Sequence, residues 1–233
     1  MSAKFDFSGK KAIVTGGVRG IGREVSIALA KAGAKVIALH VSCDVSPFDE
    51  PYAANITTVR CNVGGSRDQI CTKLTPHLPV DYLVNNAGIA MIESFPNVTE
   101  DALNEVFRVN AQGALVCSQI VAKCMLEHKI KGSIVNMSSQ ASLVALKDHT
   151  SYSMSKAAMD ALTRSMALEL GPHGIRVNSV NPTVVMTAMG RLGWSDPVKA
   201  KRMLDRIPLR KFAAMTTGLM FPRRRRMHNH VGH

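Results

Sequence analysis

The 233-residue chain lacks several features that would assign it to other classes of protein. No run approaches the ~18 apolar residues of a membrane-spanning helix, and the N-terminus, MSAKFDFSGK, has no apolar secretory signal. The five cysteines include no C-x-x-C spacing, which argues against a disulfide framework and against a zinc site. We therefore expect a cytoplasmic protein with reduced thiols, no membrane span and no metal.

Acidic residues are scarce at the C-terminal end. Residues 201–233 hold nine Lys and Arg against one acid, Asp205, and so carry +8 of the net charge of +12. Most of the excess charge therefore belongs to a tail, and the first 200 residues carry only 12 − 8 = +4. Its four-arginine run, Arg223–Arg226, is open to interpretation as a nucleic-acid or localisation element. Short basic runs are usually solvated, so no specific nucleic acid is expected.

The hydrophobic pattern alternates between strands and helices, and 46% hydrophobic residues allow a sizeable core. The length suits a single domain. We predict strands at residues 11–15, 35–39, 57–61, 82–84, 133–137 and 176–180, and helices within 22–32, 100–129 and 152–170. This order predicts an α/β fold, a Rossmann-like doubly wound parallel β-sheet with helices on both faces.

Two stretches interrupt this regularity. Residues 41–55 contain two prolines and no helical stripe, which predicts an irregular crossover. After Ala214 the alternation stops, and one short apolar run precedes the arginines. We expect residues 1–214 to form a single dinucleotide-binding and catalytic domain, and residues 215–233 to be an atypical basic C-terminal tail.

A glycine-rich turn, TGGVRGIG, follows the first predicted strand and opens the first predicted helix. Glycines there allow a tight turn and let a pyrophosphate approach main-chain N–H groups at the helix N-terminus. An ordinary glycine turn is the alternative, but the flanking strand and helix favour a nucleotide site. The predicted cofactor contacts are Gly16, Arg19, Gly20, Ile21 and Gly22.

The choice of nucleotide follows from charge. NAD sites usually carry an acid after the second strand, whereas a 2′-phosphate requires a cation. Here the second strand ends Leu39-His40-Val41-Ser42 without an acid, and Arg19 lies in the glycine turn. The sequence therefore favours NADPH/NADP+ over NADH, although Arg19 alone is also compatible with a solvated turn residue.

A tyrosine and a lysine, Tyr152 and Lys156, lie four residues apart on a predicted helix, so they share one face. A free tyrosine has a pKa of about 10, and a neighbouring ammonium is expected to lower it. We interpret Tyr152 as a proton donor, Lys156 as its electrostatic partner and ribose ligand, and Ser139 as the donor that orients a substrate carbonyl. Such a pair alone occurs by chance in many helices; together with the glycine turn it indicates hydride transfer.

With these motifs the chain resembles the short-chain dehydrogenase/reductase family. The matching pieces are TGGVRGIG, Asn85-Asn86-Ala87-Gly88, Asn110, Ser139, Tyr152-Ser153-Met154-Ser155-Lys156 and Asn181-Pro182-Thr183. The resemblance implies that Asn110 completes a catalytic tetrad and holds a proton-relay water. It also implies cofactor contacts from Asn62 and Val63 beside the adenine, from Thr187 at the nicotinamide end, and from Asn86, Ala87, Gly88, Tyr152, Lys156 and Val185.

Residues 166–213 resemble more specifically the branch of L-xylulose (dicarbonyl) reductases. This implies an NADPH-dependent carbonyl reductase acting on ketoses or α-dicarbonyls, with a small-molecule carbonyl compound as its partner. Ser139, Gln140, His149, Tyr152 and Trp194 would border that substrate. Without the resemblance, His149 is equally compatible with a loop histidine and Trp194 with a packing aromatic.

The C-terminus departs from the family pattern. Ala213-Ala214 runs directly into Met215-Thr216-Thr217-Gly218, so a C-terminal helix and the last core strand are missing by comparison, as if through a skipped exon or a misjoined reading frame. The alternative function is therefore a catalytically impaired variant that only binds nucleotide or associates with full-length subunits. The family is usually a homo-tetramer or dimer, and the altered C-terminus argues against that assembly here.

Overall fold

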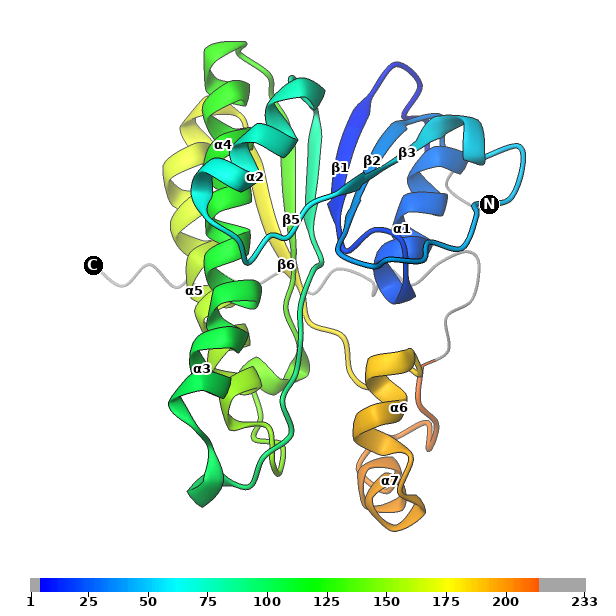
Figure 1. The fold of residues 1–233 in the computed structure, drawn as a ribbon, viewed down its shortest axis with the longest axis vertical. Coiled ribbons are helices and arrows are strands. Elements are labelled where there is room, and N and C mark those ends of the chain that lie inside the picture. Colours follow the sequence, from blue (N-terminus) through cyan, green and yellow to red (C-terminus); the bar gives the residue numbers. More distant parts are fainter. Residues whose placement is uncertain (1–4, 214–233) are drawn as a thin grey trace.

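Six short apolar strands form one parallel sheet in the computed structural model, which describes residues 5–213 (Figure 1). The strands are β1 (Lys11–Thr15), β2 (Lys35–His40), β3 (Ile56–Arg60), β4 (Tyr82–Asn85), β5 (Ser133–Met137) and β6 (Arg176–Val180). Their order across the sheet is β3-β2-β1-β4-β5-β6, with every neighbouring pair parallel. The predicted Rossmann-like doubly wound sheet is confirmed.

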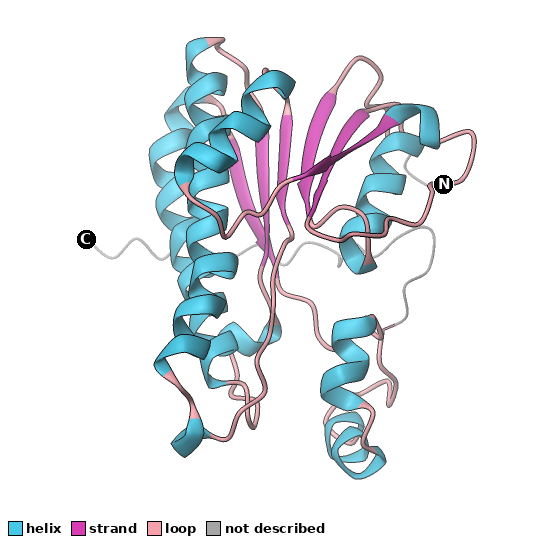
Figure 2. Cartoon of the chain, viewed as in Figure 1, coloured by secondary structure: helices cyan, strands magenta, loops and turns pink. Residues whose placement is uncertain are grey.

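The helices cover both faces of this sheet (Figure 2). They are α1 (Gly20–Lys31), α2 (Arg67–Leu74), α3 (Glu100–Phe107), α4 (Gly113–Glu127), α5 (Thr150–Leu170), α6 (Ala188–Trp194) and α7 (Pro197–Leu204). On one face α1 packs against β1, β2 and β3, while α4 and α5 pack on the other against β4, β5 and β6. The order in which the strands are added to the sheet therefore reverses between β1 and β4, and ligands bind at such a switch point in doubly wound sheets.

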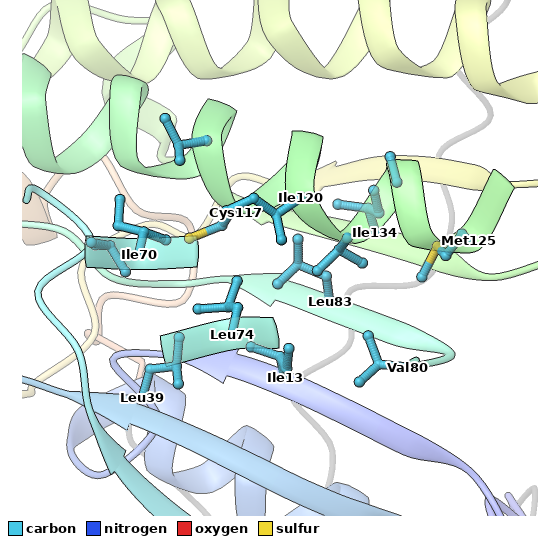
Figure 3. Packing of buried hydrophobic residues seen from close by; sticks show 14 of the residues in the cluster. Ile13, Leu39, Ile70, Leu74, Val80, Leu83, Cys117, Ile120, Met125 and Ile134 are labelled. Atoms are coloured by element: carbon cyan, nitrogen blue, oxygen red, sulfur yellow. The ribbon is translucent and has the colours of Figure 1, made fainter. Parts of the chain in front are cut away.

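The larger hydrophobic core lies between the sheet and the helices α2 and α4 (Figure 3). Ile13, Leu83 and Ile134 come from three neighbouring strands and are fully buried. Ile70 on α2 and Cys117 on α4 close over them. Burying each large aliphatic side chain contributes roughly 1.5–3 kcal/mol, so this core fixes the strand ends relative to one another.

Two features of the connections bear on the sequence-based expectations. Residues 41–55 form the irregular crossover that was predicted, with a single 3-10 turn at Ala53–Asn55. The helix α2 was not predicted, although Ser66 and Gln69 form a capping box at its start, with Ser66 N–H donating to Gln69 Oε1 at 3.0 Å. The Ser-x-x-Gln spacing was the available signal.

Helices α6 and α7 follow β6 and extend from the carboxyl end of the sheet (Figure 1). Neither was predicted. Within the described residues β6 is the edge strand, and the segment Val184–Met186 pairs with Ala213, which lies at the end of that part of the chain. The predicted basic tail, including Arg223–Arg226, lies outside the described residues. Over residues 5–213, no helix combines the length and apolar character needed to cross a membrane.

Candidate active site

The predicted site residues come from segments that follow the carboxyl ends of four strands. The glycine turn follows β1, the segment Asn86–Gly88 follows β4, Ser139 follows β5 and Thr187 follows β6. Because these strands are parallel, their carboxyl ends lie along one edge of the sheet. The fold therefore gathers residues that are more than 150 positions apart in the chain.

The glycine turn has a backbone that requires glycine. Gly16 and Gly20 have φ of +64° and +55°, in the left-handed region. A Cβ at Gly22 would lie 2.1 Å from the main-chain oxygen of Gly16. Beyond the turn, α1 begins without a side-chain cap from Arg19 and without an acid in its first turn. The uncapped N–H groups and the positive helix end fit a pyrophosphate, and Ile21 lies in this first turn.

A threonine joins the glycine turn to the segment after β4. Thr15 Oγ1 accepts hydrogen bonds from the main-chain N–H groups of Asn86 and Ala87, both at 2.9 Å. In return, Asn86 Nδ2 donates to the main-chain oxygens of Thr15 and Gly16, at 3.0 and 3.2 Å. The glycine turn and the Asn86–Gly88 segment, which are separate motifs in the sequence, therefore form one hydrogen-bonded unit.

The residues expected at the adenine end lie beyond β3. Asn62 is exposed and Val63 is buried. The amide oxygen of Asn62 already accepts a hydrogen bond from Gly64 N–H at 3.0 Å, so one further lone pair remains for a ligand. Arg19 is exposed at the start of α1, where a cation is accessible to a phosphate.

Lys156 is buried on α5, and its ammonium donates to the main-chain oxygen of Met137 at 2.7 Å. Nζ also lies 5.6 Å from the centre of the Tyr152 ring. Burial lowers the pKa of Lys156 to about 8, and the nearby Asp160 carboxylate opposes that change. The lysine therefore carries its charge at neutral pH and loses it in mildly alkaline solution.

The tyrosine departs from what was expected. Burial raises the pKa of Tyr152 above its usual value, and a hydrogen bond with Ser139 works in the opposite direction. The expectation that Lys156 would lower the pKa of Tyr152 was wrong for this structure, because the Lys156 ammonium is directed to the Met137 oxygen and desolvation of the phenol dominates. Tyr152 is thus a neutral O–H group, which suits a proton donor.

Asn110 lies in a π-helical turn, Arg108–Gln112, between α3 and α4. Its fully buried amide donates to Ile89 O at 2.9 Å and to Ser155 Oγ at 3.0 Å, and its Oδ1 accepts from Ile89 N–H at 2.8 Å. Both amide hydrogens are therefore used. A relay water on Asn110 would have to bind the main-chain oxygen or the second lone pair of Oδ1.

Asn110 and Lys156 both lie close to Gly88. A Cβ on Gly88 would lie 3.2 Å from Asn110 Oδ1 and 3.5 Å from Lys156 Nζ. The asparagine, from the π-helical turn, and the lysine, from α5, therefore approach the same point of the chain. With Ser139 and Tyr152 hydrogen-bonded, all four residues of the expected tetrad gather at this end of the sheet.

The residues expected around the substrate also come together. The His149 ring lies 6.3 Å from the Tyr152 ring at 73° and stacks 6.1 Å from the Trp194 ring at 25°. Trp194 is the last residue of α6, the helix that follows β6, and its ring lies beside His149. Gln140 follows Ser139, and its Nε2 is buried without a hydrogen-bond partner in the described residues. An unpaired buried donor beside the tetrad is consistent with a place for a polar ligand.

At the other side of the tetrad, Thr187 faces the glycine turn. Its methyl carbon would lie 3.5 Å from a Cβ built on Gly20, and its Oγ1 caps α6 by accepting from Gly190 N–H at 3.1 Å. Val185 is buried and pairs with Ala213. The position of Thr187 opposite the start of α1 fits the expected contact with the nicotinamide end of a dinucleotide.

Two residues to which the sequence patterns assigned no role, Asn181 and Asp160, connect the site. Asn181 Nδ2 donates to Ser139 O at 3.2 Å, to Ser142 Oγ at 3.0 Å and to Asp160 Oδ2 at 3.1 Å. Asn181 thereby links the segment after β6 to the segment after β5 and to α5. The matching Asn181-Pro182-Thr183 motif was noted without a role, whereas no pattern in the sequence indicated Asp160.

Comparison with known proteins agrees with this geometry. The family described as short chain dehydrogenase matches residues 10–196. L-xylulose reductase of Caenorhabditis elegans is 46% identical over 217 residues, covering 91% of this chain and 86% of that protein. D-erythrulose reductase of Gallus gallus is 46% identical over 223 residues, covering 91% and 86%.

A solved structure gives the same fold. The crystal structure of a protein described as an NAD(P)-dependent gluconate 5-dehydrogenase from Beutenbergia cavernae, with bound NADP at low occupancy, superimposes with a TM-score of 0.84. It is 31% identical, and the match covers 91% of this chain and 87% of that one. The similarity therefore extends over nearly all of the described residues.

Proposed function

Because this chain belongs to the short-chain dehydrogenase/reductase family and is an NAD(P)-dependent oxidoreductase, we propose that it is an NADPH-dependent carbonyl reductase acting on a ketose or an α-dicarbonyl. The observation that carries the proposal is the convergence of Asn110, Ser139, Tyr152 and Lys156 beside the glycine turn. The L-xylulose and D-erythrulose reductases among its relatives support a ketose as substrate.

A bound dihydronicotinamide would supply the hydride, and the protein residues would manage the proton. Ser139 would donate a hydrogen bond to the substrate carbonyl oxygen and so orient it. Tyr152, kept neutral by burial, would transfer its proton to that oxygen as negative charge develops there. The ammonium of Lys156 would stabilise the resulting phenolate, and Asn110 would hold the water through which the phenol regains a proton.

Two features support NADPH over NADH. Arg19 is an exposed cation at the start of α1, and residues 40–42, directly after Leu39, include no acid to bind a ribose 2′-hydroxyl. We expect Arg19→Ala to raise the KM for NADPH on the order of tenfold or more, because a charged hydrogen bond contributes ~1.5–3 kcal/mol. The KM for NADH should stay nearly constant. An equal change for both nucleotides would contradict the assignment.

The experiment that tests the function is a steady-state assay of NADPH oxidation with xylulose, erythrulose or 2,3-butanedione. Tyr152→Phe should lower kcat on the order of 100-fold or more, since general acid catalysis typically contributes 10²–10⁴. NADPH-induced thermal stabilisation should be retained in that variant. A folded wild-type chain that is stabilised by NADPH but reduces none of these substrates would instead select the nucleotide-binding or subunit-associating alternative.

A further inference from the structure

Asp160 follows Lys156 by one helical turn on α5, so the two side chains lie on the same face of that helix. Lys156 is 3% exposed, and its burial lowers its pKa, whereas the Asp160 carboxylate opposes that change. The other described groups close to the ammonium are uncharged: the main-chain oxygen of Met137, the Tyr152 ring and the Asn110 amide. The charge of Asp160 therefore supports the ammonium that the proposed proton transfer requires.

The Asp160 carboxylate also has a hydrogen-bond partner from outside its helix. Asn181 Nδ2 lies 3.1 Å from Asp160 Oδ2 and 3.4 Å from Oδ1. The direction of this amide is set from its other side, where Ser179 Oγ donates to Asn181 Oδ1 at 3.3 Å. Nδ2 is therefore the atom that faces Asp160, and it requires an acceptor there.

The same amide nitrogen reaches the segment that carries the proposed carbonyl donor. Asn181 Nδ2 donates to Ser139 O at 3.2 Å and to Ser142 Oγ at 3.0 Å. An amide nitrogen has only two hydrogens. Because an ionised carboxylate is the strongest of its three acceptors, one hydrogen belongs to Asp160 and the two serines share the other. Asp160 thus fixes the amide that holds Ser139, which itself forms a hydrogen bond with Tyr152.

We propose that Asp160 is a positioning residue of the active site, whose carboxylate orients Asn181 against Ser139 O and whose negative charge sustains the Lys156 ammonium. This inference rests on the proposed carbonyl reductase function and adds a residue to its machinery. One carboxylate acts on the serine that would orient the carbonyl and on the lysine that would stabilise the phenolate. Neither effect requires Asp160 to touch the substrate or the nucleotide.

Substitutions at Asp160 separate the two effects. Asp160→Asn removes the charge but keeps an oxygen that can accept from Asn181, whereas Asp160→Leu removes both. Asp160→Glu keeps the charge. Glu169→Gln is the matched control, because it removes an exposed carboxylate from the same helix. For each variant, kcat and the KM for NADPH are measured with erythrulose from mildly acidic to alkaline pH.

The pH profile of kcat reports the charge. The wild type should lose half of its maximal kcat near pH 8, where Lys156 gives up its proton. In Asp160→Asn this loss should occur at lower pH, since no carboxylate then opposes the effect of burial on the pKa of Lys156. The maximal kcat at lower pH should stay close to that of the wild type. Asp160→Glu and Glu169→Gln should both keep the wild-type profile.

The maximal kcat reports the contact with Asn181. Asp160→Leu should show the same displaced profile as Asp160→Asn and, in addition, a maximal kcat lower on the order of 10-fold, because Ser139 loses the amide that holds it. The KM for NADPH should be unchanged in every variant, since the glycine turn lies after β1 and makes no part of this network.

Urea denaturation at pH ~7 to ~10.5, the range between neutrality and the pKa of a free lysine, tests the charge without any turnover. Because the folded pKa of Lys156 lies below the unfolded value, wild-type stability should rise as pH passes about 8. In Asp160→Asn the folded pKa is lower still, so the rise should begin at lower pH. The difference from the wild type isolates this residue, and Glu169→Gln should show no such displacement.

The outcomes distinguish the inference from the function it rests on. If the protein reduces erythrulose but Asp160→Asn has the wild-type pH profiles of kcat and of stability, the inference is overturned and the proposed function stands. An equal displacement in Glu169→Gln overturns it as well. Equal maximal kcat in Asp160→Leu and Asp160→Asn overturns the role through Asn181. If the wild type reduces no substrate, the proposed function fails, and the stability profiles still decide whether Asp160 sustains the Lys156 ammonium.

Discussion

The Lys156 ammonium donates to the main-chain oxygen of Met137 across 2.7 Å, which ties α5 to the last residue of β5. The bond holds a charge in a buried position beside the Tyr152 ring. The lysine thus has two opposing effects: its charge serves the proposed proton transfer, and its burial destabilises the fold.

We expect Lys156→Met to abolish turnover while raising stability. The pKa of Lys156 falls from 10.5 to about 8 in the folded state. The unfolded chain therefore binds the proton more tightly, and at neutral pH this costs the native state roughly 3 kcal/mol. Losing the hydrogen bond to Met137 would offset about 1 kcal/mol of the gain. Urea denaturation at neutral pH checks the net increase, and a lower free energy of unfolding would contradict it.

The same shift sets the pH dependence of the wild type. Because the folded pKa lies below the unfolded value, the cost is fully present below pH about 8 and disappears as pH rises toward 10.5. Stability attributable to this residue should therefore increase over that interval. Turnover that depends on the ammonium should fall as pH rises through about 8. Lys156→Met should show no such gain in stability with pH.

The hydroxyl of Thr15 is expected to hold the segment after β4 in place. Thr15→Val preserves the side-chain shape but leaves the N–H groups of Asn86 and Ala87 without their acceptor. Each buried unpaired group costs ~1–3 kcal/mol, so chemical denaturation should report a loss in that range or above. Thr15→Ser keeps the hydroxyl and serves as the control. Equal stabilities for the two variants would show that the hydroxyl has no such role.

The close approach at Gly22 should exclude any side chain. Gly22→Ala would put a Cβ 2.1 Å from Gly16 O, so we expect ~1–3 kcal/mol of destabilisation and loss of NADPH-induced thermal stabilisation. Gly171→Ala is the matched control, since a Cβ there meets nothing within 4 Å and its φ is −55°. Calorimetry with and without NADPH measures both variants. Retained nucleotide binding in Gly22→Ala would refute the proposed role of the turn.

Arg23 should position the irregular crossover next to the nucleotide site. Its guanidinium donates to the main-chain oxygens of Ser46, at 2.9 Å, and Pro47, and lies 4.2 Å from the centre of the Phe48 ring. These contacts are exposed, so Arg23→Ala should cost at most about 1 kcal/mol of stability. We expect its KM for NADPH to rise several-fold with kcat unchanged.

This effect is measured by comparing kcat and the KM for NADPH of Arg23→Ala with those of Arg164→Ala. The Arg164 variant removes an exposed arginine from α5. The Arg164 variant should match the wild type in both constants. A fall in kcat without a change in KM for the Arg23 variant would place its role elsewhere.

The parallel sheet and the glycine turn were predictable because their signals are local. Strands buried on both faces are short apolar runs, and a turn with positive φ at Gly16 and Gly20 requires glycine. The capping box of α2, Ser66-x-x-Gln69, was equally local and was overlooked. By contrast, the π-helical turn that contains Asn110 has no sequence signature, because it depends on how α3 and α4 pack.

The pKa of Tyr152 shows why part of the site could not be predicted from the sequence. Its spacing from Lys156 placed both residues on one helix face but gave no information on where the ammonium points. In the fold that ammonium is taken up by Met137 O, and desolvation of the phenol prevails. Asp160 and the role of Asn181 were missed for the same reason, since their contacts join segments that are distant in sequence.

The sequence by itself determined the fold class and predicted the glycine turn and the four residues of the proposed tetrad, because each depends on residue type at fixed spacing along the chain. Only the tertiary structure decided which groups are buried and which segments their hydrogen bonds join, such as Lys156 Nζ to Met137 O. Those properties arise from desolvation and from hydrogen bonds between segments brought together by folding, so short-range sequence patterns do not predict them.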